Sequence, residues 1–549
     1  MTIQPSEPRL KGAVALAAAA LLALTLIGFF FTPGHTYLQS DTQIYIPIFE
    51  RIEHPNLFER DFLISTAHIG LTIYDETAIG LRRLTHGTFE SVLAGEQIVF
   101  RVLGLWGVFL IATALGLGDA AALLLAACVG LGATIVGPAV LSIEYEPVPR
   151  GFAIAFLLLA SGLLMHERYA WACAAASAGF LYHSPSTIPF WILFAVVVFL
   201  ERQWRACWPL AAATVVLAGS FAAQRSNIRP QPFLAVIDPL WEQVIRMRTA
   251  YDWIDQWPAG SVLAFVLYCT VSLWALWRIR DRTTVTQRIV LGGFPLLGVA
   301  SIPVSWVLLD VWKWALIAQV QPARAALFTI VFAQINCGLA GLIAVRDRRW
   351  FEGLLWFVPV FLPPVMPQVT EATLARIAAV GLLTLIAVGT VWKARWLAAP
   401  AVALVGCWAI PYLAHTINYP PLHSSELDQL SEWARTQTSD QALFVFPTSG
   451  RNLEQGVFRV KALRGLYSDW KAGGQVNYFR DFALEWRRRW SELSSGKLTV
   501  DDWRARGVDY LIYAGAQAEQ IGQPVFQNAR YRAYRIAAPA AAPASRNAP

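Results

Sequence analysis

The chain has 549 residues, of which 56% are hydrophobic and only 15% are charged, and its formal net charge is +7. A soluble globular chain carries roughly 25% charged residues, so this composition argues against a soluble enzyme, a disordered chain or a fibrous protein and predicts a polytopic membrane protein. The positive charge does not require nucleic acid, because Lys and Arg gather in the cytoplasmic loops of membrane proteins.

A helix that crosses a bilayer needs about 20 mostly apolar residues. By that criterion the sequence predicts about thirteen transmembrane helices. Their approximate ranges are 13–32, 96–117, 119–140, 151–165, 169–183, 187–200, 206–223, 259–277, 289–309, 325–345, 351–367, 373–391 and 396–413.

Basic residues predict the orientation of these helices, because Lys and Arg mark cytoplasmic loops. Arg9 and Lys11 precede the first helix, and alternate loops are short and basic, at 166–168, 202–205, 278–288, 346–349 and 393–395. A cytoplasmic N-terminus then places the long segments on the outer face, at 33–95, 141–150, 224–258, 310–324 and 414–549. In a bacterium we expect the protein to lie in the inner membrane, with its outer face and the C-terminal domain in the periplasm.

Two outer segments are long enough to carry structure of their own. Segment 33–95 predicts a first loop with two amphipathic helices that lie along the membrane surface. Residues 414–536 mix strand and helix patterns and predict a soluble α/β domain. The expected fold is therefore an α-helical polytopic membrane domain over 1–413, a periplasmic α/β domain over 414–536, and a disordered Ala/Pro-rich tail at 537–549.

Familiar catalytic motifs are missing from the sequence. It has no GxxxxGK[ST] loop, no GxGxxG after a strand, no HExxH and no GxSxG. Polar residues at the outer ends of the predicted helices remain. Ionisable groups are costly at a membrane, so these residues are functional candidates.

The first candidate is Asp41, which follows the first predicted helix. A carboxylate here can act as a general base on an acceptor hydroxyl. It can equally be a helix N-cap, a position that Asp and Ser favour.

Two carboxylates and an arginine lie together between the third and fourth helices. Glu144 and Glu146 can hold a divalent cation, and the planar guanidinium of Arg150 matches phosphate oxygens. The alternative is an ion-paired surface turn held by Pro147 and Pro149.

Further candidates lie at other outer helix ends. His183 can bind a phosphate or metal or transfer a proton, or be a hydrogen-bonded helix terminus. Arg324 opens the tenth helix, where a cation suits an anionic lipid head group or anchors the helix at the interface. Trp241, Arg246 and Arg248 suit sugar stacking and phosphate contact, or interfacial anchoring.

This layout resembles the GT-C superfamily of integral membrane glycosyltransferases, whose members have many spans and an acidic residue in the first outer loop. It also resembles a bacterial family of polytopic proteins with the same plan. The stretches that carry the resemblance are Asp41–Pro47, Pro55–Asp61, Glu146-Pro147 with Arg150, Gln321–Arg324, Tyr467–Lys471 and Glu485-Trp486.

The resemblance implies an inverting glycosyltransferase of cell-envelope polysaccharide biosynthesis. Its donor would be a sugar on a polyprenyl phosphate, and its acceptor a glycan or a lipid-linked glycan. Asp41 matches the catalytic Asp and would be the general base. The other implied roles are donor phosphate binding by Arg150, His183 and Arg324, substrate contacts by Tyr45, Gln321, Trp241, Arg246 and Arg248, and a Mg or Mn ion at Glu144 and Glu146.

Three other functions fit the same pattern. A transporter or flippase for lipid-linked saccharides would share the helices and the cationic mouths, but transporters tend to show inverted repeats. A ligase or polymerase of preformed glycans would use similar donors. Asp41 stands alone between Ser40 and Thr42, whereas many superfamily members pair acidic residues there, so a non-catalytic assembly partner is the third alternative.

Overall fold

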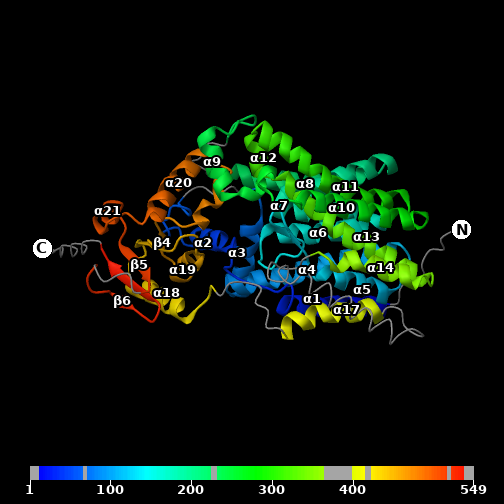
Figure 1. Ribbon diagram of the computed structural model, residues 1–549, viewed down its shortest axis with the longest axis horizontal. Coiled ribbons are helices and arrows are strands. Elements are labelled where there is room, and N and C mark those ends of the chain that lie inside the picture. Colours follow the sequence, from blue (N-terminus) through cyan, green and yellow to red (C-terminus); the bar gives the residue numbers. More distant parts are fainter. Residues whose placement is uncertain are drawn as a thin grey trace. The chain divides into compact units, whose positions relative to one another are not determined.

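The computed structural model describes residues 11–65, 71–223, 231–363, 398–413, 422–515 and 521–536. The chain divides into two compact units (Figure 1). The helical unit comprises Met1–Thr36, Gly70–Arg225 and Thr249–Asn418, and the α/β unit comprises Tyr37–Ile69, Ser226–Arg248 and Tyr419–Pro549. The predicted helix at 373–391 and the predicted tail at 537–549 lie outside the described residues.

The helical unit consists of long apolar helices and a small hairpin. Seven of the described helices are long and apolar enough to cross a membrane, and the full number of spans stays a prediction. The helices are α1 (Lys11–Phe30), α3 (Tyr74–Thr85), α4 (Phe89–Ala114), α5 (Asp119–Gly130), α6 (Pro149–Met165), α7 (Tyr169–Glu201), α8 (Trp208–Ala223), α10 (Ser261–Ile279), α11 (Val285–Ser305), α12 (Ala315–Val320), α13 (Ala326–Arg346), α14 (Trp350–Phe361) and α17 (Ala398–Leu413).

The core of the helical unit is built around α13, which is buried from Ala326 to Val345. Asn336 in this helix donates hydrogen bonds to Ser272 Oγ and to the Leu291 carbonyl, both at 2.8 Å. These bonds satisfy the buried NH2 group of Asn336 and join α13 to α10 and α11.

The helix α7 folds back on itself at His183, whose backbone torsions are non-helical. Pro185 cannot donate to the Leu181 carbonyl four residues earlier, and the backbone N–H of Ile73 donates to that carbonyl instead, at 3.0 Å. A straight helix of 33 residues would separate its ends by about 50 Å. Here Tyr169 and Glu201, the two ends, both hydrogen-bond Thr286.

Loops that the sequence assigns to the cytoplasm share one end of this unit. Gln287 Nε2 donates to the carbonyls of Ala114 and Met165, at 3.1 and 3.4 Å, and Arg346 donates to the Gly116 carbonyl at 3.1 Å. The ends of α4, α6 and α13 and the start of α11 therefore lie together. This is what we expect if the loops at these helix ends are on the same side of the membrane.

The predicted helix over 119–140 is wrong in its second half. α5 ends at Gly130, and the chain continues as an antiparallel hairpin of β1 (Thr134–Ile135) and β2 (Val140–Leu141). Gly132 and Gly137 have φ values of +73° and +102°, which no helix can accommodate. The segment is apolar throughout, so hydrophobicity alone could not show the break.

The α/β unit contains a five-stranded sheet in the order β4-β3-β5-β7-β6. Its strands are β3 (Leu443–Val445), β4 (Gly465–Leu466), β5 (Tyr510–Ala514), β6 (Phe526–Gln527) and β7 (Tyr531–Arg535). β3 runs parallel to β4 and β5, while β7 is antiparallel to β5 and β6. The helices are α2 (Thr42–Glu53), α9 (Pro239–Arg248), α18 (Ser425–Gln437), α19 (Glu454–Ala462), α20 (Arg480–Ser495) and α21 (Val500–Ala505).

The helices α2 and α9 belong to this α/β unit, although they come from the predicted outer-face segments 33–95 and 224–258, far upstream of the predicted α/β domain. Ile46 and Phe49 of α2 are buried within it, and Gln43 Nε2 donates to the Leu453 carbonyl at 3.0 Å, 410 residues away. The blue α2 lies beside α19 in Figure 1. Trp241 of α9 donates through Nε1 to the Val476 carbonyl at 2.8 Å.

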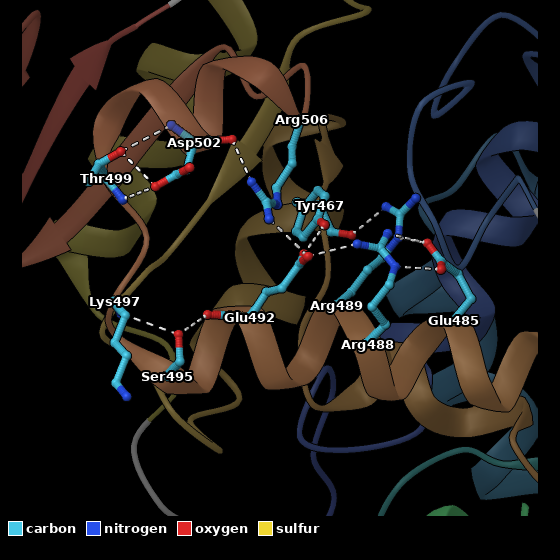
Figure 2. Close-up of polar contacts among 10 residues, drawn as sticks. All are labelled: Tyr467, Glu485, Arg488, Arg489, Glu492, Ser495, Lys497, Thr499, Asp502 and Arg506. Atoms are coloured by element: carbon cyan, nitrogen blue, oxygen red, sulfur yellow. Dashed lines mark hydrogen bonds and ion pairs between the residues drawn. The ribbon is translucent and has the colours of Figure 1, made fainter. Parts of the chain in front are cut away.

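The arginine-rich helix α20 forms an ion-pair network (Figure 2). Glu485 accepts from Arg488 Nε at 2.8 Å and from Arg489 Nε at 2.7 Å. Glu492 accepts from Arg488 Nη1 at 2.7 Å and from Arg506 Nη2 at 3.0 Å. Arg488 holds the pKa of the Glu485 carboxyl at about 2, well below its usual range.

Candidate functional site

A cavity of about 190 Å³ in the helical unit brings together four predicted residues, Arg150, His183, Gln321 and Arg324. Arg150 lies in the first turn of α6, His183 at the bend of α7, and Gln321 and Arg324 at a 3₁₀ turn before α13. The apolar part of the lining includes Ile154, Ile188, Ile192, Leu297, Val304 and Phe328. The cavity thus combines cationic groups with hydrocarbon walls.

Arg150 forms an ion pair with Glu144. Its Nε and Nη2 both approach Glu144 Oε1, at 2.8 and 2.7 Å. This is the ion-paired turn that the sequence left open. Within the described residues no group of three His, Cys, Asp or Glu side chains could hold a metal ion. A Mg or Mn ion at Glu144 and Glu146 therefore stays a prediction.

The bend of α7 fixes the His183 ring. Its Nδ1 accepts a hydrogen bond from the backbone N–H of Ser186 at 3.3 Å, and the Ser186 hydroxyl lies 2.8 Å from the same atom. Because Nδ1 is an acceptor here, the neutral ring carries its proton on Nε2. Arg150 and Arg324 both lie within electrostatic range of the ring. The surroundings of this imidazole are therefore positive and favour an anion.

Arg324 contributes a guanidinium with a buried Nε to this cavity. Its guanidinium lies over the Tyr251 ring, 5.1 Å from the centroid, and its Nε has no hydrogen-bond partner within the described part of the chain. Gln321 Nε2 donates to Asp252 Oδ2 at 2.9 Å, which holds the turn before Arg324. A buried N–H without an acceptor is costly, so an anion in the cavity would relieve that cost.

In the α/β unit, Asp41 occupies the N-cap position of α2, but its side chain makes no capping hydrogen bond. Its Oδ1 instead accepts from Lys471 Nζ at 2.9 Å and from the Ser40 hydroxyl at 3.3 Å. Asp41 has 38% of its side chain exposed, whereas Lys471 has 10%. Tyr45, one turn further along α2, is half-buried. The ammonium group of Lys471 therefore orients a carboxylate that solvent can reach.

A cluster of cations surrounds Trp470, the neighbour of Lys471. The guanidinium groups of Arg248 and Arg451 lie over its ring, 5.0 and 4.3 Å from the centroid. Arg248 also donates through Nε to the Trp470 carbonyl at 3.1 Å. Sequence reasoning missed Arg451, since an arginine in a polar turn after Gly450 is typical of ordinary surface.

Trp241 and Arg246, two of the predicted substrate contacts, both contact other residues of the α/β unit. Trp241 is 1% exposed and packs in the core of the α/β unit, so it presents no face for a sugar. Arg246 pairs with Glu242 one helical turn earlier, at 2.9 Å. Of the three candidates in α9, Arg248 is the one placed beside Trp470.

No protein-family model and no curated protein sequence matches the chain. Solved structures similar to it include ArnT from Cupriavidus metallidurans in the apo state, with 14% identity, a TM-score of 0.47, and coverage of 96% of this chain and 99% of that one. Arabinofuranosyltransferase AftD from Mycobacteria has 15% identity and a TM-score of 0.44, with coverage of 97% and 40%.

A third similar structure is the Archaeoglobus fulgidus oligosaccharyltransferase in complex with Zn and sulfate, with 10% identity, a TM-score of 0.38, and coverage of 90% of this chain and 68% of that one. Two of these three proteins are, by name, an arabinofuranosyltransferase and an oligosaccharyltransferase. All three TM-scores lie below 0.5, so the roles proposed below rest on this chain's own residues.

Proposed function

We propose that this chain is a membrane glycosyltransferase that takes a sugar from a polyprenyl-phosphate donor and passes it to a glycan or lipid-linked acceptor in the periplasm. The observation that carries the proposal is the cavity of Arg150, His183 and Arg324 with its apolar walls. A polyprenyl phosphate has the same two parts, an anionic head and a hydrocarbon tail. The match supports a lipid-linked anion rather than a free one.

The cavity offers N–H donors to a phosphate. Arg324 Nε has no hydrogen-bond partner among the described residues, His183 Nε2 carries a proton in the neutral ring, and Arg150 adds a second guanidinium. Charge-assisted hydrogen bonds to phosphate are the strong ones. They gain strength as the departing phosphate takes up negative charge, so they favour bond breaking over donor binding alone.

In the reaction we propose, the Asp41 carboxylate accepts the proton of the acceptor hydroxyl as that oxygen attacks the anomeric carbon. The new carbon–oxygen bond forms while the bond from the anomeric carbon to the phosphate oxygen breaks. The electron pair leaves with polyprenyl phosphate, whose charge Arg150 and Arg324 stabilise. Attack opposite the leaving group inverts the anomeric configuration. No step is assigned to a metal ion.

Lys471 is a positioning residue in this proposal, because it acts through Asp41. Its hydrogen bond to Oδ1 fixes the direction of the carboxylate. Arg248 and Arg451, over Trp470, are assigned to an anionic group on the acceptor, since guanidinium groups match phosphate and carboxylate oxygens.

The test is lipid-linked glycan profiling of a deletion strain complemented with variants. Wild type and the control Glu59→Gln, an exposed carboxylate of the same segment, should restore the acceptor product. Asp41→Asn and Arg324→Gln should accumulate donor beside unmodified acceptor, with normal amounts of protein in the membrane. Donor confined to the inner leaflet in the deletion strain would show a flippase, and full activity of Asp41→Asn would remove this residue from the mechanism.

A further inference from the structure

A second hollow of the helical unit lies apart from the residues discussed so far. It is a groove of about 910 Å³ lined by α3, α4 and Tyr182 of α7. Ligand pockets commonly measure about 300–1,000 Å³. Leu81, Val92, Val99 and Phe100 supply apolar walls, so the groove can hold a hydrocarbon chain.

The groove contains the buried carboxylate of Glu96, which interacts with the side chains of Tyr182 and Thr77. Glu96 is 6% exposed, and its Oε1 accepts a hydrogen bond from the Tyr182 hydroxyl at 3.1 Å. Its Oε2 is buried and has no hydrogen-bond partner in the described part of the chain. A buried carboxylate oxygen without a donor is costly. It therefore points to a ligand that brings an N–H or O–H group.

Glu76, on α3, is a second carboxylate on the groove. Its Oε1 accepts from the Ser220 hydroxyl at 3.4 Å, and within the described residues neither Glu76 nor Glu96 forms an ion pair. Burial and the neighbouring Asp75 raise the pKa of the Glu76 carboxyl to about 7. A raised pKa of this kind is what a carboxylate without a nearby cation shows.

Open space adjoins both carboxylates. A Cβ atom added to Gly80 on α3, or to Gly95 beside Glu96, would meet no other atom within 4 Å. Both glycines line the groove. The two carboxylates and the apolar walls thus face a hollow that the described part of the chain leaves unfilled.

We propose that this groove binds a phospholipid with a primary ammonium head group, such as phosphatidylethanolamine. The ammonium group donates to Glu96 Oε2 and to Glu76, and an acyl chain lies along the apolar walls. A primary ammonium supplies three N–H donors together with the positive charge that two carboxylates favour. A quaternary ammonium supplies the charge without donors, and the anionic head group of phosphatidylglycerol supplies hydroxyl donors without the positive charge. The site is separate from the donor cavity and does not depend on the proposed transferase activity.

The experiment is native mass spectrometry of the full chain, with phosphatidylethanolamine, phosphatidylcholine and phosphatidylglycerol of identical acyl chains in competition. Wild type should retain phosphatidylethanolamine about tenfold more than either competitor, the scale of one lost hydrogen bond to a charged group. Glu96→Gln and Glu76→Gln should each lose that preference. Glu90→Gln, an exposed carboxylate in the first turn of α4, should keep it.

Two results would overturn the proposal. One is equal retention of phosphatidylethanolamine and phosphatidylcholine by wild type, because a donor-dependent site must separate them. The other is an unchanged preference in Glu76→Gln. This variant keeps the test decisive if Glu96→Gln, whose side chain is more deeply buried, gives too little folded protein.

Discussion

Arg459 and Asp61 form a completely buried ion pair, with Nε 2.8 Å from Oδ2 and neither side chain exposed to solvent. Arg459 also approaches Asp469 Oδ2 at 3.1 Å, and Asp61 accepts from the backbone N–H of Leu466 at 2.8 Å. Burial by itself lowers the pKa of the Arg459 guanidinium, but the carboxylates of Asp469 and Asp61 outweigh it and raise that pKa above its ordinary value. The segment around Asp61 is thereby joined to the sheet of the α/β unit.

Removing one partner of this pair should destabilise the α/β unit strongly. Arg459→Met leaves two buried carboxylates without a cation, and such changes cost about 3–5 kcal/mol. Denaturation of the purified full chain, followed by Trp fluorescence, measures the loss. Arg535→Met, which removes an exposed arginine at the end of β7, should cost less than about 0.5 kcal/mol. Equal effects of the two substitutions would contradict the assignment.

The Asp41–Lys471 contact should control the chemical step. Asp41→Asn should lower kcat about 10²- to 10⁴-fold, the usual contribution of a general base. Lys471→Met should lower kcat about tenfold without changing donor KM, since one charge-assisted hydrogen bond is lost, and Lys471→Arg should restore part of it. The assay uses donor isolated from the deletion strain. A rise in donor KM with unchanged kcat would place Lys471 in donor binding instead.

The donor cavity should show a different kinetic pattern, with effects on both donor KM and kcat. Arg324→Gln and Arg150→Gln each remove a guanidinium from the phosphate site and should raise donor KM roughly 10- to 100-fold, the range for a hydrogen bond between charged groups, and they should also lower kcat because the lost hydrogen bonds are stronger to the departing phosphate. Thermal shifts on addition of polyprenyl phosphate should shrink in parallel. Arg288→Gln alters an exposed arginine at the other end of α11 and is the control. Unchanged shifts in both cavity variants would exclude the site.

Glu485 should make stability depend on pH (Figure 2). Its folded pKa of about 2 lies below the ordinary value of 4.5, so the folded state binds a proton less readily than the unfolded state. The stabilising effect is complete above about pH 4.5 and is lost as pH falls towards 2. Melting curves should therefore separate wild type from Glu485→Gln at pH 7 and converge in acid. A gap that widens in acid would refute this.

The folding back of α7 can be tested by labelling from one side of the membrane. Single cysteines at His166 and Trp204, both exposed, should react with an impermeant maleimide from the same side, and one at Gln256 from the other. Cys207 is the one native cysteine that is not buried, so it is replaced in a Cys207→Ser background, and the other five cysteines are buried and can stay. Reaction of positions 166 and 204 from opposite sides would show that α7 crosses once.

Most of the helical unit could be predicted from the sequence because apolar composition is a local signal. The hairpin after α5 could not, since its positive-φ glycines lie within an equally apolar run. The partner of Asp41 was also hidden: Lys471 lies 430 residues away, and no periodicity links the two. The burial of Trp241 could not be predicted either, because an aromatic residue beside arginines has the same pattern whether it is buried or exposed.

The α/β unit draws on three separate stretches of the chain, and this sets the order of its biogenesis. Asp61 and Arg459 are 398 residues apart. At a synthesis rate of roughly 5–20 residues per second, the first waits about 20–80 s for the second. During that interval the early segment, with Asp41, must persist outside the membrane without its sheet. The contact of Asp41, the proposed base, with Lys471 therefore forms only after the helices between these segments have been made. A chain whose synthesis stops before Arg459 lacks this contact and should be inactive.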